Sequence, residues 1–148
     1  IKYCRTPEVN PASMLDLGAG TGLLSLTAAF LGAKKIRACD NNTLACEVAE
    51  KNSRLNGYEN IIEVNEVDLR QNLPSTRVDL VVANLYHTLL AELFQESSFW
   101  QAKLYIVAGF IPSMEPELLA SLPVDRIRMI ERNRSDRWCL WVMTPKNV

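Results

Sequence analysis

Histidine is the scarcest metal-binding residue in this chain of 148 residues, since His87 is the only one. The four cysteines, Cys4, Cys39, Cys46 and Cys139, form no Cys-x-x-Cys pair. A zinc site needs closely spaced ligands of these types, so we expect no bound metal. Unpaired cysteines among apolar residues are typical of buried thiols in a reducing compartment, which favours a cytoplasmic protein.

Long hydrophobic runs are missing as well. No apolar stretch approaches the roughly 20 residues of a membrane-spanning helix, and we recognise no signal peptide, so we expect no membrane partner. The formal net charge of -1 excludes a strong overall attraction to nucleic acid. Basic residues do gather near the end of the chain, and they suit either solvated charges on an exposed hairpin or a docking face for an acidic or RNA partner. They are Arg126, Arg128, Arg132, Arg134, Arg137 and Lys146.

Glycine is also uncommon, with six residues in all, yet three of them stand at positions 18, 20 and 22. The apolar run Met14 to Leu17 before them predicts a short buried strand, and the helical spacing of apolar residues from Leu23 to Leu31 predicts a helix. The glycines therefore lie between a strand and a helix N-terminus. We expect unpartnered backbone N–H groups and the helix dipole to receive a polar or anionic ligand there.

The spacing of these glycines narrows the choice of ligand. A dinucleotide-binding loop needs its third glycine where this chain has Leu23. A phosphate-binding Walker loop needs Lys followed by Ser or Thr, whereas Leu23 and Leu24 follow Gly22. The remaining pattern, Asp-x-Gly-x-Gly-x-Gly after a strand, is similar to the first motif of the S-adenosylmethionine-dependent methyltransferases.

Strand-like and helix-like segments alternate along the chain, which predicts five βα units and a terminal hairpin. We expect one α/β domain over residues 1–148, with a doubly wound, mostly parallel, seven-stranded Rossmann-like sheet whose C-terminal hairpin adds an antiparallel strand. The expected strands are 14–17, 34–39, 60–64, 78–83, 103–108, 126–132 and 138–143, with a turn at 133–136. The expected helices cover 23–31, 43–56, 89–94 and 112–122.

Polar residues follow each of the first four expected strands. They are Asp16 with the loop Gly18 to Gly22, then Asp40, Asp68 and Asn84. Ligands of open α/β sheets bind at the carboxyl ends of the strands, so these residues are candidates for one site. The spacing from Gly18 to Asp40 is typical of a carboxylate that binds the two hydroxyls of a ribose.

Together these residues resemble the catalytic domain of the PrmA-type ribosomal-protein lysine methyltransferases. The resemblance begins at Asp16 to Gly22 and includes Val82-Ala83-Asn84, Ala108-Gly109-Phe110-Ile111 and the ending Arg137-Trp138-Cys139-Leu140-Trp141-Val142. It covers nearly the whole chain. It implies a cytoplasmic enzyme that transfers a methyl group from S-adenosyl-L-methionine to an amine of a protein, with a ribosomal protein as the partner.

The resemblance also implies roles for single residues in cofactor binding. Gly18 and Gly20 lie near the methionine part, and Asp16 helps to hold its amino group. Asp40 binds the ribose, Asn41 lies near the adenine, and Asp68 accepts a hydrogen bond from the adenine amine, although Glu66 is close enough to compete for that role. The expected cofactor-binding set is completed by Ala19, Gly22, Leu69 and Asn84.

Three residues are candidates for catalysis. Methyl transfer is an in-line displacement that depends on alignment, and Asn84 has a side-chain oxygen that can accept a hydrogen bond from the incoming amine. His87 is a candidate for taking up the proton, against the alternative of a helix-end residue with no chemical role. Tyr86 either lines the substrate pocket or only packs.

The chain departs from the family pattern in several places. The family's usual Pro-Gly-Gly turn before the fifth strand is replaced by Ser98-Phe99-Trp100-Gln101, and Leu85-Tyr86-His87 follows Asn84. The latter differs from the Asn-Pro-Pro-Tyr of enzymes that methylate nucleobases or glutamine amides. In the family, a cofactor-covering segment and a substrate-recognition domain precede the catalytic domain, and we expect residues 1–148 to lack that upstream part. Methylation of RNA or of a small molecule, and cofactor binding without turnover, stay open as alternatives.

Overall fold

The computed structural model describes residues 11–135 and 137–146. They fall into two compact units, Ile1–Leu73 and Pro74–Val148, and each unit is described by itself. Of the expected features, Cys4 and the last residue of the expected turn, Asp136, lie outside the described residues.

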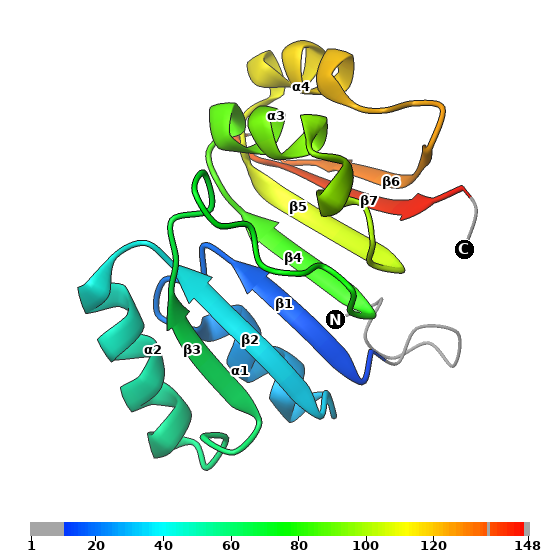
Figure 1. Ribbon diagram of the computed structural model, residues 1–148. Coiled ribbons are helices and arrows are strands. Elements are labelled where there is room, and N and C mark those ends of the chain that lie inside the picture. Colours follow the sequence, from blue (N-terminus) through cyan, green and yellow to red (C-terminus); the bar gives the residue numbers. More distant parts are fainter. Residues whose placement is uncertain (1–10, 136, 147–148) are drawn as a thin grey trace. The chain divides into compact units, whose positions relative to one another are not determined.

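The first unit has three parallel strands and two helices (Figure 1). Strand β1 pairs with β2, and β2 pairs with β3. Both helices pack on these strands, and because both connections step in the same direction, right-handed crossovers put them on one face. The bounds are β1 (Ser13–Leu17), α1 (Leu23–Phe30), β2 (Lys35–Asp40), α2 (Thr43–Leu55) and β3 (Ile62–Glu66).

The sequence explains these elements. In β1, Met14, Leu15 and Leu17 are buried, and β2 likewise buries most of its apolar residues, as strands of a parallel sheet covered by helices do. Helix α2 begins after Asn42, whose side-chain oxygen accepts a hydrogen bond from the backbone N–H of Ala45 at 3.1 Å. This cap satisfies one of the free N–H groups at the helix start.

The expectation of five βα units is wrong in number: helices follow four strands, and none follows β3, where no expected helix lies either. Residues 67–79, which follow β3, contain turns and bends but no helix. Asp68 favours the turn, because its carboxylate accepts hydrogen bonds from the backbone N–H of Arg70 at 3.0 Å and from the side chain of Gln71 at 2.9 Å. Pro74 also disfavours a helix over this segment.

The second unit has four strands in the order β4-β5-β7-β6, with α3 and α4 lying side by side in Figure 1. Strands β4 and β5 are parallel, and β7 is antiparallel to both of its neighbours, which confirms the expected antiparallel strand. The bounds are β4 (Leu80–Asn84), α3 (His87–Gln95), η2 (Ser97–Phe99), β5 (Leu104–Phe110), η3 (Pro112–Met114), α4 (Glu115–Ser121), β6 (Ile127–Arg134) and β7 (Cys139–Pro145).

The strand ends in this unit differ from the expected ones by one or two residues, and two of these differences have a local structural reason. Strand β6 continues through Asn133 and Arg134, which were expected in the turn. Strand β5 continues past Gly109 to Phe110, because a bulge accommodates the glycine without ending the pairing with β7. No helix among the described residues is long and apolar enough to cross a membrane.

An aromatic cluster occupies the place of the Pro-Gly-Gly turn. Phe94, Phe99, Trp100 and Tyr105 contact one another with ring centroids 4.9 to 6.0 Å apart. The buried Tyr105 hydroxyl donates to the carbonyl of Phe99 at 2.7 Å and accepts from the N–H of Ala102 at 2.6 Å. Burial raises the pKa of Tyr105 to about 12, so this phenol stays protonated and acts as a structural hydrogen-bond donor.

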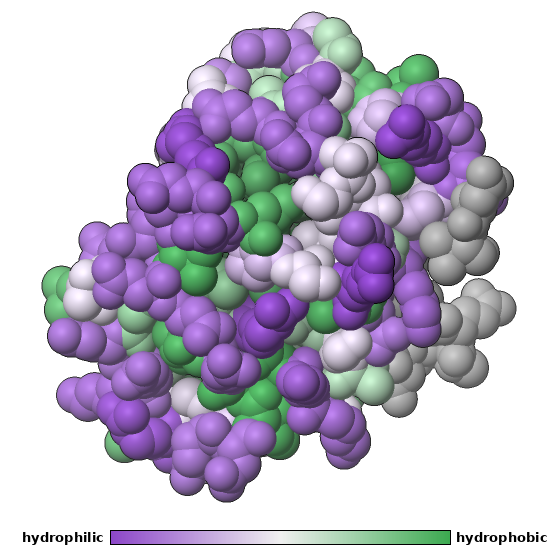
Figure 2. Space-filling view, in the orientation of Figure 1, coloured by the Kyte–Doolittle hydropathy of each residue, from purple (hydrophilic) through white to green (hydrophobic). Residues whose placement is uncertain are grey.

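Polar residues cover most of the face shown in Figure 2, and hydrophobic residues reach the surface in patches between them. The larger apolar side chains of the strands are inside, among them Leu15, Leu80, Phe110 and Trp141, each with at most 1% of its surface exposed. The sheet strands therefore supply the core, and the helices cover it.

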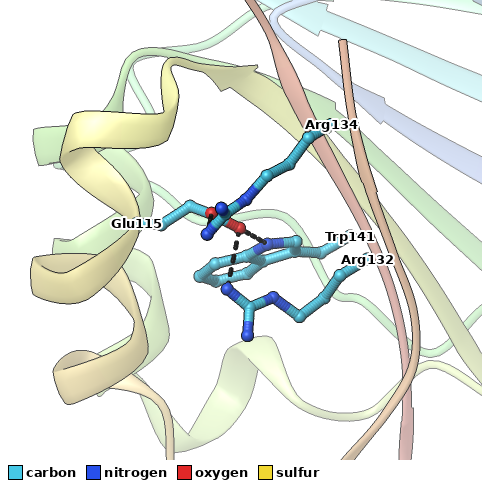
Figure 3. Close-up of polar contacts among 4 residues, drawn as sticks. All are labelled: Glu115, Arg132, Arg134 and Trp141. Atoms are coloured by element: carbon cyan, nitrogen blue, oxygen red, sulfur yellow. Dashed lines mark hydrogen bonds and ion pairs between the residues drawn. The ribbon is translucent and has the colours of Figure 1, made fainter.

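A buried carboxylate joins α4 to the terminal hairpin (Figure 3). Glu115 accepts a hydrogen bond from the indole N–H of Trp141 at 2.7 Å and one from Arg132 at 3.1 Å, and it forms an ion pair with Arg134. Burial raises the pKa of the Glu115 carboxyl, but the hydrogen bonds from Trp141, Arg132 and Arg134 together lower it below its usual range. The carboxylate is therefore charged whenever the protein is folded near neutral pH.

This network also accounts for part of the basic C-terminal region. Arg132 and Arg134 pair with Glu115, the Arg126 guanidinium lies 3.7 Å from the Asp125 carboxylate, and the Lys146 ammonium donates to the carbonyl of Val124 at 2.6 Å. These contacts favour the interpretation of the basic residues as structural and solvated charges.

Glu115→Ala is expected to lower the free energy of unfolding by about 2–4 kcal/mol, because it leaves the buried indole N–H of Trp141 without an acceptor and two arginines without their partner. Because the folded pKa of Glu115 is lowered, its contribution is present above the unfolded pKa and is lost as the pH falls through the folded value. Urea denaturation of both proteins at pH 7 measures the difference.

The matched control is Glu117→Gln on the same helix, whose carboxylate is exposed and lies 4.0 Å from the imidazole of His87. That control should change the stability by less than about 1 kcal/mol. Equal effects of the two substitutions would contradict the role given to Glu115.

Candidate functional site

The glycine loop of the first unit is held against the end of β2. The backbone N–H groups of Gly18 and Ala19 both donate to the carbonyl of Cys39, at 2.9 and 3.0 Å. The Gly20 N–H donates to a carboxylate oxygen of Asp40 at 2.8 Å, and the Gly22 N–H donates to the carbonyl of Ala19 at 2.8 Å. The expectation that the N–H groups of this loop are without partners is therefore wrong for these four residues, because they fix the loop itself.

Gly22 lets the loop approach helix α2 closely. It has φ +78° and serves as the N-cap of α1, and a Cβ there would lie 3.2 Å from the Cβ of Ala49. A side chain at this position would meet both a strained backbone conformation and a tight contact. The close packing of the loop against α2 therefore depends on the absence of a side chain at Gly22.

Asp40 is the last residue of β2 and is partly buried. One carboxylate oxygen accepts from Gly20 as described, and the other accepts from the N–H of Asn42 at 3.0 Å. A carboxylate offers about four lone-pair positions, so each oxygen can accept one more hydrogen bond. The side chain is therefore fixed in orientation and still able to accept from two hydroxyl groups.

Asp16 lies in β1 beside this loop and is fully buried. One oxygen accepts a hydrogen bond from the Ser25 hydroxyl at 2.6 Å, whereas Oδ1 is buried and has no partner among the described residues. Burial raises the pKa of Asp16 to about 6; hydrogen bonds from Ser25 lower it, and the charge of Asp40 raises it further. An unpartnered buried carboxylate oxygen is suited to a cationic donor such as an ammonium group.

The other predicted residues of this unit lie at the ends of β2 and β3. Asn41 is exposed directly after Asp40, and Leu69 is buried. Asp68 is exposed and uses both carboxylate oxygens within its own turn, while Glu66 pairs in register with Asp40 across the two strands. The adenine-facing role stays a prediction for Asp68, with Glu66 as the competing residue.

Three predicted catalytic residues gather at the start of α3 in the second unit. Asn84 is the exposed last residue of β4, Tyr86 is the half-exposed N-cap of α3, and His87 is its first residue. The imidazole Nε2 of His87 lies 4.0 Å from a carboxylate oxygen of Glu117. One short segment therefore presents an amide, a phenol and an imidazole together.

Two polar residues of the first unit were not identified from the sequence as part of a site. Ser25 contacts Asp16 directly, and the side-chain amide of Asn52 donates to the carbonyl of Thr21 at 2.9 Å, which ties α2 to the glycine loop. For Asn52 the available signal was a polar residue among the apolar residues that share one side of α2. The apolar spacing of α1 gave no signal for Ser25, because it grouped Leu23 and Phe30, which are exposed, whereas Ser25 is buried. Among the described residues, no group of three or more His, Cys, Asp or Glu side chains could hold a metal ion.

Comparison with known proteins identifies the family of the chain. Residues 3–146 match the family model described as ribosomal protein L11 methyltransferase (PrmA). A relative named ribosomal protein L11 methyltransferase, from Carboxydothermus hydrogenoformans, is 34% identical over 137 residues, which are 90% of this chain and 45% of the relative. The chain thus spans about half the length of the curated relatives it matches.

Solved structures agree at the level of the fold. The crystal structure of a ribosomal protein L11 methylase from Lactobacillus delbrueckii subsp. bulgaricus has a TM-score of 0.81 and 26% identity, covering 91% of this chain and 70% of that one. A putative tRNA (m1A22) methyltransferase of Streptococcus pneumoniae in complex with S-adenosyl-L-methionine has a TM-score of 0.76 and 16% identity, covering 91% and 66%. The fold is therefore the α/β Rossmann-like methyltransferase fold with an antiparallel C-terminal end. On its sequence match and its fold, the chain belongs to the ribosomal protein L11 methyltransferase (PrmA) family.

Proposed function

We propose that this chain transfers a methyl group from S-adenosyl-L-methionine to an amine nitrogen of a ribosomal protein, with ribosomal protein L11 as the substrate. The observation that carries the proposal is the glycine loop held between two carboxylates, Asp16 and Asp40, in a chain that belongs to this family. The relatives named for L11 methylation support the choice of substrate. Three buried free cysteines, Cys39, Cys46 and Cys139, support a reducing compartment and hence the cytoplasm.

The residues of the first unit suit the cofactor in three respects. The unpartnered Oδ1 of Asp16 fits its ammonium group, and the Asp40 carboxylate has capacity for the two ribose hydroxyls. The glycine loop, from Gly18 through Ala19 and Gly20 to Gly22, is assigned to the methionine part, and a Cβ at Gly20 would meet nothing within 4 Å, so a ligand can approach the backbone there. Asn41, Asp68 and Leu69 are assigned to the adenine side.

The sulfonium of S-adenosyl-L-methionine supplies an activated methyl group with a good leaving group. We assign the alignment of the acceptor to Asn84, whose side-chain oxygen accepts a hydrogen bond from the amine and so directs the nitrogen lone pair. Tyr86 lines the acceptor side. His87 is the candidate for taking up the released proton, with Glu117 near enough to stabilise the imidazolium.

Methyl transfer to L11 is the direct test of the substrate. The intact protein is incubated with methyl-labelled cofactor and either purified L11 or ribosomal RNA, and incorporation of label into each is counted. We expect label in L11 alone, on lysine or the N-terminal amine by mass spectrometry. Asn84→Ala should lower the rate roughly 100-fold, because the acceptor loses its alignment. Label in the RNA alone, or tight cofactor binding by the wild type with no transfer, would contradict the proposal.

Asp40→Ala is expected to weaken cofactor binding roughly 10- to 100-fold, because charged hydrogen bonds to hydroxyls contribute about 1.5–3 kcal/mol each. Titration calorimetry measures the dissociation constant. Glu47→Ala, which removes an exposed carboxylate from α2 in the same unit, is the control and should leave the affinity unchanged. An unchanged affinity of Asp40→Ala would remove Asp40 from the site.

Asp16 predicts a pH dependence near its pKa of about 6. A bound ammonium group favours the ionised carboxylate, so binding at pH 6 should release about half a proton, and the affinity should fall nearly tenfold per pH unit below 6. Calorimetry at pH 6 in two buffers of different ionisation enthalpy counts the protons. Asp16→Asn should show no release.

The raised pKa of Asp16 acts in the opposite direction on the stability of the free protein, which falls with rising pH whereas the cofactor affinity rises. Because the folded pKa of Asp16 is raised from 3.8 to about 6, its contribution to the free energy of unfolding is largest below pH 3.8 and is lost as the pH rises through 6. Asp16→Asn should remove this pH dependence of the free energy of unfolding in urea denaturation.

For the cofactor-binding prediction, a wild-type proton release of zero at pH 6 would contradict the placement of the ammonium group at Asp16.

A further inference from the structure

Strand β5 carries a bulge at Gly109. In the pairing with β7, Ala108 lies opposite Leu140 and Phe110 opposite Cys139, so Gly109 is the extra residue. It has φ +97°, a backbone conformation that residues with a side chain rarely adopt. Bulges of this kind redirect a strand and are frequent beside active sites.

The backbone of Leu85 lies directly on this glycine. A Cβ at position 109 would stand 2.3 Å from the carbonyl oxygen of Leu85 and 2.8 Å from both its carbonyl carbon and its nitrogen. The Leu85 N–H in turn donates to the carbonyl of Ala108 at 3.1 Å, and the Leu85 side chain is buried. The contact is therefore between two backbones, neither of which can move aside like a flexible side chain.

Leu85 is the residue between the two groups that the proposed mechanism uses on this segment. Asn84 precedes it and pairs in register with Ala108, while Tyr86 follows it and caps α3. Leu85 lies between Asn84 and Tyr86 in the chain. Its backbone conformation therefore affects the direction in which the Asn84 amide and the Tyr86 ring point. The bulge thus determines the geometry at the end of β4.

We propose that Gly109 is the positioning residue of the acceptor site, because its missing Cβ allows the Leu85 backbone to seat on the β5 bulge and so fixes Asn84 and Tyr86. The inference rests on the proposed function for the role of Asn84. A Cβ would have to move from 2.3 Å to ordinary contact at 3.4 Å, which displaces the segment by about 1 Å. A misplacement of that size costs about 100-fold in rate.

The test compares Gly109→Ala with Gly32→Ala. Gly32 has φ +107° and nothing within 4 Å of a built Cβ, so this control carries the same backbone strain without the contact with Leu85. In the intact protein, Gly109→Ala should lower kcat for methyl transfer 10- to 100-fold and weaken cofactor binding much less, because the glycine loop, Asp16 and Asp40 lie in the first unit. Gly32→Ala should change neither. Equal loss of kcat in both variants would overturn the proposal.

Hydrogen exchange supplies a readout that does not depend on activity. Gly109→Ala should speed exchange of the amides of residues 85–87, whereas Gly32→Ala should not. In the wild type, the Leu85 amide should exchange much more slowly than that of the exposed Asn41, because it is bonded to Ala108. If Gly109→Ala does not fold, the comparison of the Leu85 and Asn41 amides in the wild type still tests the proposal. Rapid exchange of the Leu85 amide would contradict the contact of its backbone with the β5 bulge. If the wild type transfers no methyl group, only the proposed function is refuted. The exchange data then test independently whether Gly109 fixes the position of the Leu85 segment.

Discussion

The hydrogen bond between the Gly20 N–H and the Asp40 carboxylate is the contact on which the candidate cofactor site depends. It joins the end of β1 to the end of β2, and the bonds from Gly18 and Ala19 to the carbonyl of Cys39 hold the same junction. The loop is consequently rigid before any ligand binds. A rigid site loses less conformational entropy on binding, and this is what preorganisation contributes to affinity.

The two carboxylates at this junction are suited to different tasks because their surroundings differ. Asp40 is partly exposed and fixed by two backbone N–H groups, which leaves it an acceptor for neutral hydroxyls. Asp16 is buried with one unpartnered oxygen, which makes ionisation costly until a cation lies beside it. In the second unit, Glu115 is also buried, but three donors surround it, so it remains charged and structural. Burial alone therefore does not make a carboxylate a candidate for ligand binding; an acceptor without a partner is needed as well.

Local patterns in the sequence were enough to predict most elements, although the strand ends differ from the expected ones by one or two residues. The strand before the glycines, the capped helix α2 and the antiparallel strand β7 follow from periodicity and turn residues. What could not be predicted depends on contacts between distant residues. The Glu115 network joins positions 17 to 26 residues apart, and the bulge at Gly109 depends on the approach of Leu85. The N–H groups of Gly18, Ala19 and Gly20 have their acceptors on another strand. Such pairings have no signature within a single segment.

The central claim is that the glycine loop, Asp16 and Asp40 hold S-adenosyl-L-methionine. A crystal structure of the intact protein with the product S-adenosylhomocysteine tests it most directly. The account predicts both ribose hydroxyls within about 3 Å of the Asp40 carboxylate oxygens and the ligand's amino group at the same distance from Oδ1 of Asp16. A ligand bound elsewhere, or a ribose out of hydrogen-bond reach of Asp40, would contradict it.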